Sequence, residues 1–222
     1  MKKDWIRAPG GVMLLLVALS VAGCINPIVD SWSGETVSDA LITYQGVTYD
    51  IPALQAMKIP PGQYQVIVSS PNHHPVVTTI TVGGSGDVPP IRLMPYRRIY
   101  SPLVADAMLC RAIDMQGIPI GPGWNYTPLD VQVLAWIRWN INDTDSHYQT
   151  TRWYRPDGVL YKEEVLPPFA RTPGSVSLIS APGLPLQQAP GWNVPAPAAL
   201  PGTWVVEVIL DGSRAVKMSF AI

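Results

Sequence analysis

Residues 201–222 of the chain are PGTWVVEVILDGSRAVKMSFAI. On both sides of Asp211-Gly212, apolar and polar side chains alternate, and β-branched and aromatic residues are frequent, as is typical of strands. Asp-Gly between two such runs is a strong signal for a β-hairpin, because these residues accept the positive φ angles of a tight turn. The stretch therefore predicts a terminal hairpin and indicates a β fold.

The composition of the whole chain agrees with an all-β fold. The 222 residues include 24 prolines and 18 glycines, which favour turns, and only 14% of the residues are charged, which argues against wholesale disorder. The formal net charge is −1, and the lysines and arginines form no cluster, so no nucleic-acid partner is expected. Length alone allows one large sandwich or two small ones.

Upstream of the hairpin, residues 129–139 and 150–154 alternate like strands. Residues 166–201 are rich in proline, glycine and alanine, and only 175–179 among them are patterned as a strand. This stretch is longer than usual loops, which predicts a functional surface excursion or a poorly ordered segment. Two segments resemble strands of many bacterial immunoglobulin-like domains: Arg155-Pro156-Asp157-Gly158 and Gly202-x-Trp204-x-Val206-x-Val208. The resemblance implies an immunoglobulin-like β-sandwich over residues 103–222.

The first half of the chain carries a second set of short strands. Residues 40–44, 47–51, 64–69 and 76–82 are separated by turns of glycine, proline and asparagine. The motifs that carry a resemblance are Ala40-x-Ile42-x-Tyr44-x-Gly46, Pro61-Gly62-x-Tyr64-x-Val66-x-Val68 and Thr78-x-Ile80-x-Val82. They resemble the PEGA and carboxypeptidase-regulatory-like modules, which implies a small transthyretin-type β-sandwich over residues 35–95 that binds or spaces. Residues 96–102, with a proline nearby and paired arginines, are expected to form a linker.

The amino end of the chain resembles a bacterial lipoprotein signal. Basic residues precede an apolar stretch of about a dozen residues, which is too short to span a bilayer, and Val21-Ala22-Gly23-Cys24 follows. The resemblance implies a signal peptide over residues 1–23 and lipidation of Cys24, with residues 24–34 as a tether. A plain signal peptide is the alternative. Ile25 stands where an aspartate would retain such proteins at the inner membrane, which favours the outer membrane.

Cysteine usage and the other reactive residue types give no support for an enzyme. With Cys24 lipidated, Cys110 has no partner for a disulfide, and its alternating neighbours predict a buried thiol. No nucleophile elbow, phosphate-binding loop or Cys/His metal cluster is present, so no catalytic residue and no cofactor are expected. Some proteins with transthyretin-like folds are small hydrolases, so a small hydrolase remains a third possible function.

Tryptophan is the residue type that most suggests binding. In residues 131–139 the period of two places Val131 and Trp139 on the core face, and Trp136 and Arg138 on the more polar face. Trp136, Arg138 and the nearby Trp124 are therefore the candidate partner-binding residues, because aromatic faces stack on sugars and anchor protein interfaces. The alternative is that Trp136 is simply a covered aromatic.

Two polar loops are weaker candidates for a metal. Asp143 and Asp145 are spaced so that a loop could wrap a hard cation, but a polar turn needs the same residue types. The pair His73-His74 is expected at an exposed loop tip, since adjacent side chains point apart.

Together these features predict a protein held to a membrane by its lipid, with a non-catalytic role in the cell envelope. The expected partner is a protein complex or a glycan, and the anchor would raise the effective concentration of even a weak contact. A carbohydrate- or peptidoglycan-binding accessory lipoprotein is the alternative function.

Overall fold

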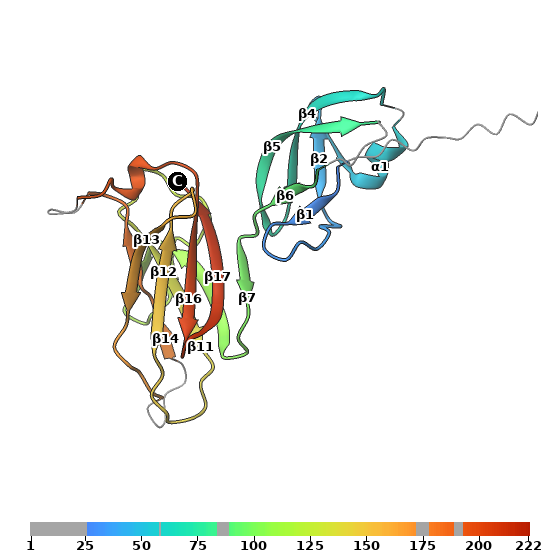
Figure 1. Cartoon of the computed structure of the whole chain (residues 1–222). Helices are drawn as coiled ribbons and strands as arrows, with labels where there is room; N and C mark the ends of the chain where they lie inside the picture. The colour runs from blue at the N-terminus through green and yellow to red at the C-terminus, as the bar shows by residue number, and fades with distance from the viewer. Residues whose placement is uncertain (1–25, 58, 84–88, 172–177, 189–192) are drawn as a thin grey trace, which may run out of the picture.

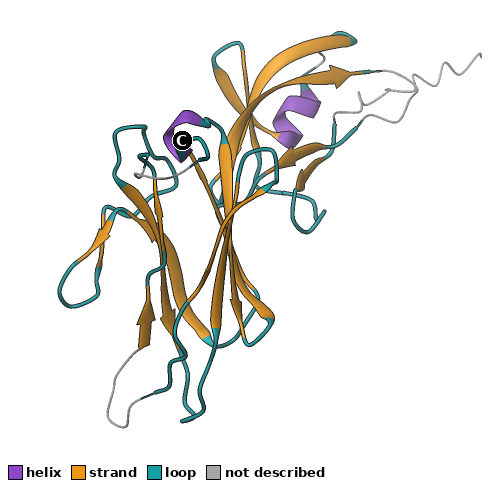
Figure 2. Ribbon diagram, turned by 60° about the vertical axis from the view of Figure 1, so that its left-hand side comes forward, coloured by secondary structure: helices purple, strands orange, loops and turns teal. Residues whose placement is uncertain are grey.

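The described residues of this computed structural model, 26–57, 59–83, 89–171, 178–188 and 193–222, form an all-β protein with one short α-helix (Figures 1 and 2). This confirms the expected fold class. The predicted signal peptide and Cys24 lie outside the described residues. The strands gather into two lobes, each with a hydrophobic core of its own (Figure 1).

The N-terminal lobe, which ends with β6 at Leu93, is built on an antiparallel sheet in the order β3-β2-β4-β5. A parallel pair, β1 and β6, lies beside it, and the core between them includes Ile28, Ile42, Val68 and Leu93. The elements of this lobe are β1 (Ile28–Asp30), β2 (Leu41–Tyr44), β3 (Val47–Asp50), α1 (Ile51–Ala56), β4 (Gly62–Ser70), β5 (His73–Val82) and β6 (Ile91–Leu93).

Two features of this lobe differ from the sequence prediction. Part of the expected tether, residues 24–34, is the strand β1, which pairs with β6 and buries Ile28. Because the strand has three residues and its partner lies far along the chain, local pattern could not reveal it. The helix α1 was not foreseen either; it begins where the Asp50 side chain accepts the Ala53 N–H at 2.6 Å, with Pro52 in the first turn.

The C-terminal lobe is a sandwich of two sheets. One sheet has the order β13-β12-β16-β17-β7, and in the other β11 pairs with β8, β14 and β15. The elements are β7 (Arg97–Ile99), β8 (Val104–Cys110), β9 (Ala112–Ile113), β10 (Pro119–Ile120), β11 (Gln132–Trp139), β12 (Gln149–Tyr154), β13 (Leu160–Val165), β14 (Leu178–Ser180), β15 (Gly183–Pro185), the 3-10 helix Pro197–Ala199, β16 (Thr203–Leu210) and β17 (Ser213–Ala221).

The predicted terminal hairpin is confirmed. Strands β16 and β17 pair from Thr203↔Ala221 to Leu210↔Ser213, and Asp211 and Gly212 turn the chain with φ angles of 49° and 80°. The alternation predicted from the sequence places Trp204 and Phe220 inside the sandwich, where both are fully buried.

Three expectations about the second lobe need correction. Residues 97–99 of the expected linker form β7, which pairs with β17 and so becomes an edge strand of this lobe. The stretch 166–201 contains β14, β15 and a 3-10 helix. The two strands form because β14 pairs with the end of β11 and β15 pairs with its beginning. Residues 175–177 of the strand expected there lie outside the described residues. Val131 precedes β11 and is 74% exposed, so it does not belong to the core.

Candidate binding groove at the junction of the two lobes

The two lobes meet through a buried polar contact. The Nε2 atom of His74, on β5, lies 2.9 Å from Oγ of Ser219, on β17. The Ser219 hydroxyl donates to the carbonyl oxygen of Pro95 at 2.6 Å, so its oxygen is left to accept the N–H of His74. Burial lowers the pKa of His74, and the nearby His73 adds to the effect. The contact therefore holds a neutral imidazole against the second lobe.

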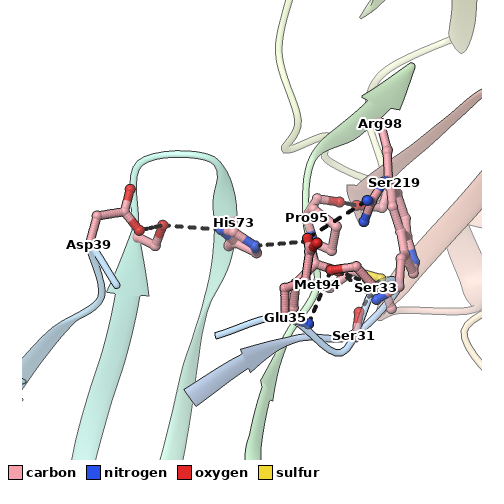
Figure 3. A network of polar contacts seen from close by, with 12 residues as sticks. Ser31, Ser33, Glu35, Asp39, His73, Met94, Pro95, Arg98 and Ser219 are labelled. Atoms are coloured by element: carbon pink, nitrogen blue, oxygen red, sulfur yellow. Dashed lines mark hydrogen bonds and ion pairs between the residues drawn. The ribbon is translucent and has the colours of Figure 1, made fainter. Parts of the chain in front are cut away.

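The histidine pair was expected at an exposed loop tip, and that prediction is wrong. His73 and His74 begin β5 and are 9% and 8% exposed. His73 lies 3.1 Å from the Ser70 hydroxyl through Nδ1 and 3.4 Å from the Asp30 carboxylate through Nε2 (Figure 3). The two rings do point apart, as adjacent side chains on a strand must, but each meets a different element that covers it.

Aromatic rings extend the same junction. The ring of Tyr96 packs edge-on against His74, with centroids 4.5 Å apart, and is stacked on Trp124 at 5.3 Å. Trp124 is partly buried and packs against the core of the C-terminal lobe. The candidate residue Trp124 thus lies in the contact between the lobes, where stacking on Tyr96 occupies one of its faces.

A groove adjoins this junction, over the outer face of the sheet β12-β16-β17. It has a volume of about 410 Å³, within the range of about 300–1,000 Å³ that is typical of ligand sites. The residues that line it come from the three strands β12, β16 and β17, from the turn between β12 and β13, and from the connection between the lobes. They are Met94, Tyr154, Arg155, Pro156, Gly158, Thr203, Val205, Glu207, Arg214 and Lys217.

Glu207 is the central charge of the groove. Its side chain is 10% exposed and lies 3.0 Å from Nη2 of Arg214 and 3.5 Å from Nζ of Lys217. The Tyr154 hydroxyl donates to its second oxygen at 3.4 Å, and burial raises the pKa of that tyrosine. Two cations therefore share one carboxylate, which leaves a formal positive charge in the groove.

The groove is part of a row of charges that crosses the sheet. Register pairs join Glu163 to Arg152, Arg152 to Glu207, Glu207 to Lys217 and Lys217 to Arg98. All five side chains share the outer face, because residues at the same register point to the same side of a sheet.

The row of charges also reaches the N-terminal lobe. Lys217 lies over the ring of Trp32 at 4.8 Å from its centroid, and Arg98 lies 3.8 Å from Glu35. Figure 3 shows Arg98, from the C-terminal lobe, and Glu35, from the N-terminal lobe, where the two lobes meet. Sequence reasoning missed the groove, because Tyr154, Glu207 and the two cations of β17 belong to three strands that only the sheet brings together.

The structure places Trp136 inside the protein. The residue is 5% exposed, its Nε1–H donates to the Gly117 carbonyl at 2.7 Å, and it packs beside Cys110. The connection between β9 and β10 covers this face, together with Ile179, and local alternation could not foresee that cover. The alternative reading, a covered aromatic, fits the structure. Arg138 is exposed, but the expected partner-binding pair with Trp136 does not form a surface.

Cys110 is fully buried, as the sequence predicted, and burial raises the pKa of its thiol. A thiol with a raised pKa holds little of the reactive thiolate at neutral pH.

The loop that holds Asp143 and Asp145 is organised around a histidine. Nε2 of His147 lies 2.9 Å from Asp143, and Nδ1 lies 2.7 Å from Asp211. Hydrogen bonds that His147 donates to Asp211 and Asp143 favour its charged form, so the pKa of His147 is raised above its usual value. Asp143 also accepts the backbone N–H of Asp145 at 3.1 Å, as in a polar turn. Within the ranges that the structure describes, no group of three or more acidic, histidine or cysteine side chains could hold a metal ion.

No protein-family model and no curated protein matches the chain. Among solved structures, an immunoglobulin-like protein from Pseudomonas aeruginosa is similar at 12% identity and a TM-score of 0.32, covering 56% of this chain and 94% of its own. No helix of the described part of the chain is long and apolar enough to cross a membrane.

Proposed function

We propose that this chain is a lipid-anchored cell-envelope protein that binds a partner without catalysis, and that the junction groove is its binding site. The groove carries the proposal: it is a concave site with unbalanced charge, at a junction of lobes where ligand sites commonly lie. Cys24 would carry the lipid, and the N-terminal lobe would be a PEGA-like spacer, as their sequences suggest. The outer membrane is the expected location.

The state of the reactive side chains supports a binding role. Cys110 is buried with a raised pKa, and both ring nitrogens of His147 and one of His74 are held in short contacts with protein groups. A general base or nucleophile must instead reach a bound substrate. A glycan-binding role through Trp136 loses its main support, because that ring is buried.

Photo-crosslinking in cells tests the binding role. A photo-reactive phenylalanine analogue is introduced at Thr203, which lines the groove, and at Met115, which is 99% exposed away from it. A defined protein adduct from position 203 that is missing from position 115 supports the proposal. Equal labelling at both positions, or no adduct at 203, contradicts it.

Fractionation tests the anchor separately. Cys24→Ser removes the sulfur that would be acylated, so the variant is expected in the soluble fraction while the parent chain fractionates with membranes. If the variant still behaves as an integral membrane protein, the anchor is not at Cys24.

A further inference from the structure

We infer that the junction groove recognises an extended acidic segment of a partner protein, with Arg214 and Lys217 as the anchors for its carboxylates. The inference rests on the proposed function and adds the chemistry of the partner. Its three supports are the unbalanced charge of the groove, its apolar lining and its position between the lobes.

The unbalanced charge lies at Arg214 and Lys217. Both contact the same carboxylate, Glu207, whereas the other arginine of the groove, Arg155, is paired through Nε and Nη2 with both oxygens of Asp157. The Arg214 side chain is 49% exposed, and a guanidinium has five N–H donors. Arg214 can therefore hold Glu207 and a second carboxylate at once.

Aromatic rings fix the direction of this guanidinium. Arg214 lies over the ring of Tyr100 at 5.4 Å from the centroid, and Arg98 lies over the same ring at 5.9 Å. Lys217 is held over Trp32 on the opposite lobe. Cations packed on rings lose less freedom when they bind an anion, so the site is preorganised for negative charge.

The rest of the lining favours a polypeptide over an acidic glycan. Met94, Pro156 and Val205 offer aliphatic surface beside the cations. Neither tryptophan nor asparagine nor glutamine is among the described residues that line the groove, so it offers no indole for sugar stacking and no side-chain amide for sugar hydroxyls. Acidic side chains alternating with apolar ones along an extended segment would match both features.

The position of the groove couples the occupant to both lobes. Met94 belongs to the connection between them, and Lys217 lies on β17 beside Ser219, which carries the buried contact with His74. An acidic segment bound at Lys217 would thus lie against the seam of the two lobes.

A defined peptide array tests the inference on the full chain. Each acidic hexapeptide, with glutamates alternating with leucines, is paired with a counterpart in which glutamines replace the glutamates. The parent chain is expected to bind the acidic members about tenfold more tightly than the amide members. Hydrogen bonds between a cation and a carboxylate are stronger than those between a cation and a neutral amide, and a tenfold change in Kd needs only a small difference in binding free energy. The preference should weaken with added salt.

Three variants sharpen the test. The double variant Arg214→Gln with Lys217→Met should lose the acidic preference, and Arg92→Gln, an exposed cation on β6, should keep it. Glu207→Gln should increase the preference, because it releases both cations from their internal carboxylate. A gain of binding cannot come from loss of folding.

Several outcomes would overturn the inference. These are equal binding of acidic and amide peptides, a preference that survives in the double variant, or an oligogalacturonate that competes as well as the acidic peptides do. If the array shows no acidic preference while position 203 still forms a protein adduct in cells, the partner chemistry is wrong and the binding role stands. If neither is seen, the proposed function fails with it.

Discussion

The two faces of the sheet β13-β12-β16-β17-β7 are made from alternate residues of the same strands, yet they differ in what they contribute. The inner face presents Trp153, Trp204 and Phe220, each with no exposed surface. The outer face presents the row of charges that includes Arg152, Glu207 and Lys217. Apolar burial dominates the free energy of folding, whereas exposed ion pairs contribute about 0–1 kcal/mol each. The inner face therefore accounts for stability, and the outer face is free to serve recognition.

The largest effect is expected on the inner face. Trp204→Ala should lower the free energy of unfolding by about 3–5 kcal/mol, because it removes a fully buried indole that packs against the rings of Tyr161 and Phe220. Its neighbour Thr203 lies on the outer face, and Thr203→Ala should change stability by less than about 0.5 kcal/mol. Urea unfolding measures both. Similar losses at the two positions would contradict the division between the faces.

The next largest effect is expected at Ser219, where the N-terminal lobe covers the outer face of the sheet. Ser219→Val should cost about 1–3 kcal/mol, because it leaves the His74 N–H and the Pro95 carbonyl without partners in a buried contact. Ser213→Val at the exposed start of β17 is the matched control and should cost little. Denaturant unfolding is again the measurement. Equal costs at 213 and 219 would mean that the junction adds no stability.

A smaller effect depends on pH and lies at the end of the sheet. The pKa of His147 is raised in the folded protein, so its contribution to stability is complete below the unfolded pKa of about 6.5 and is lost as pH rises through the folded pKa. His147→Gln should therefore remove a fall in Tm that the parent chain shows as the pH rises from 6.5 to 9.

The comparison with the parent chain isolates His147, because Cys110, whose pKa burial raises, affects the stability of both chains alike near pH 9. The pKa of His74 is lowered, so this residue stays neutral throughout that range in the folded protein. Thermal unfolding at a series of pH values gives the comparison. If the variant keeps the full pH dependence of the parent, the pairing of His147 with Asp143 and Asp211 does not contribute to stability.

The smallest effect is expected within the row of charges itself. Arg152 and Glu163 pair at 2.5 Å on the outer face, with 41% and 40% of their side chains exposed. A double-mutant cycle with Arg152→Gln and Glu163→Gln should give a coupling of about 0.2–1 kcal/mol. A coupling of several kcal/mol would make the outer face a source of stability and remove the contrast with the inner one.

Much of the fold was open to prediction from the sequence because it depends on neighbours along the chain. Alternation and the Asp211-Gly212 turn specify the hairpin of β16 and β17, and the same alternation places Trp204 in the core. The period of two also specifies that Trp136 and Trp139 lie on opposite faces of β11. It cannot specify what covers a face, and for this reason Trp136 was expected at a surface.

The rest was decided by tertiary structure, because it depends on segments that are distant in sequence. Strands β1 and β7 are three residues long and exist through their partners β6 and β17. His74 is buried because Ser219 lies against it. The groove forms because the sheet register places β12 and β16 beside β17, which carries both Arg214 and Lys217. A sequence fixes which way each side chain points along its own strand. Only the packed chain determines what that side chain meets.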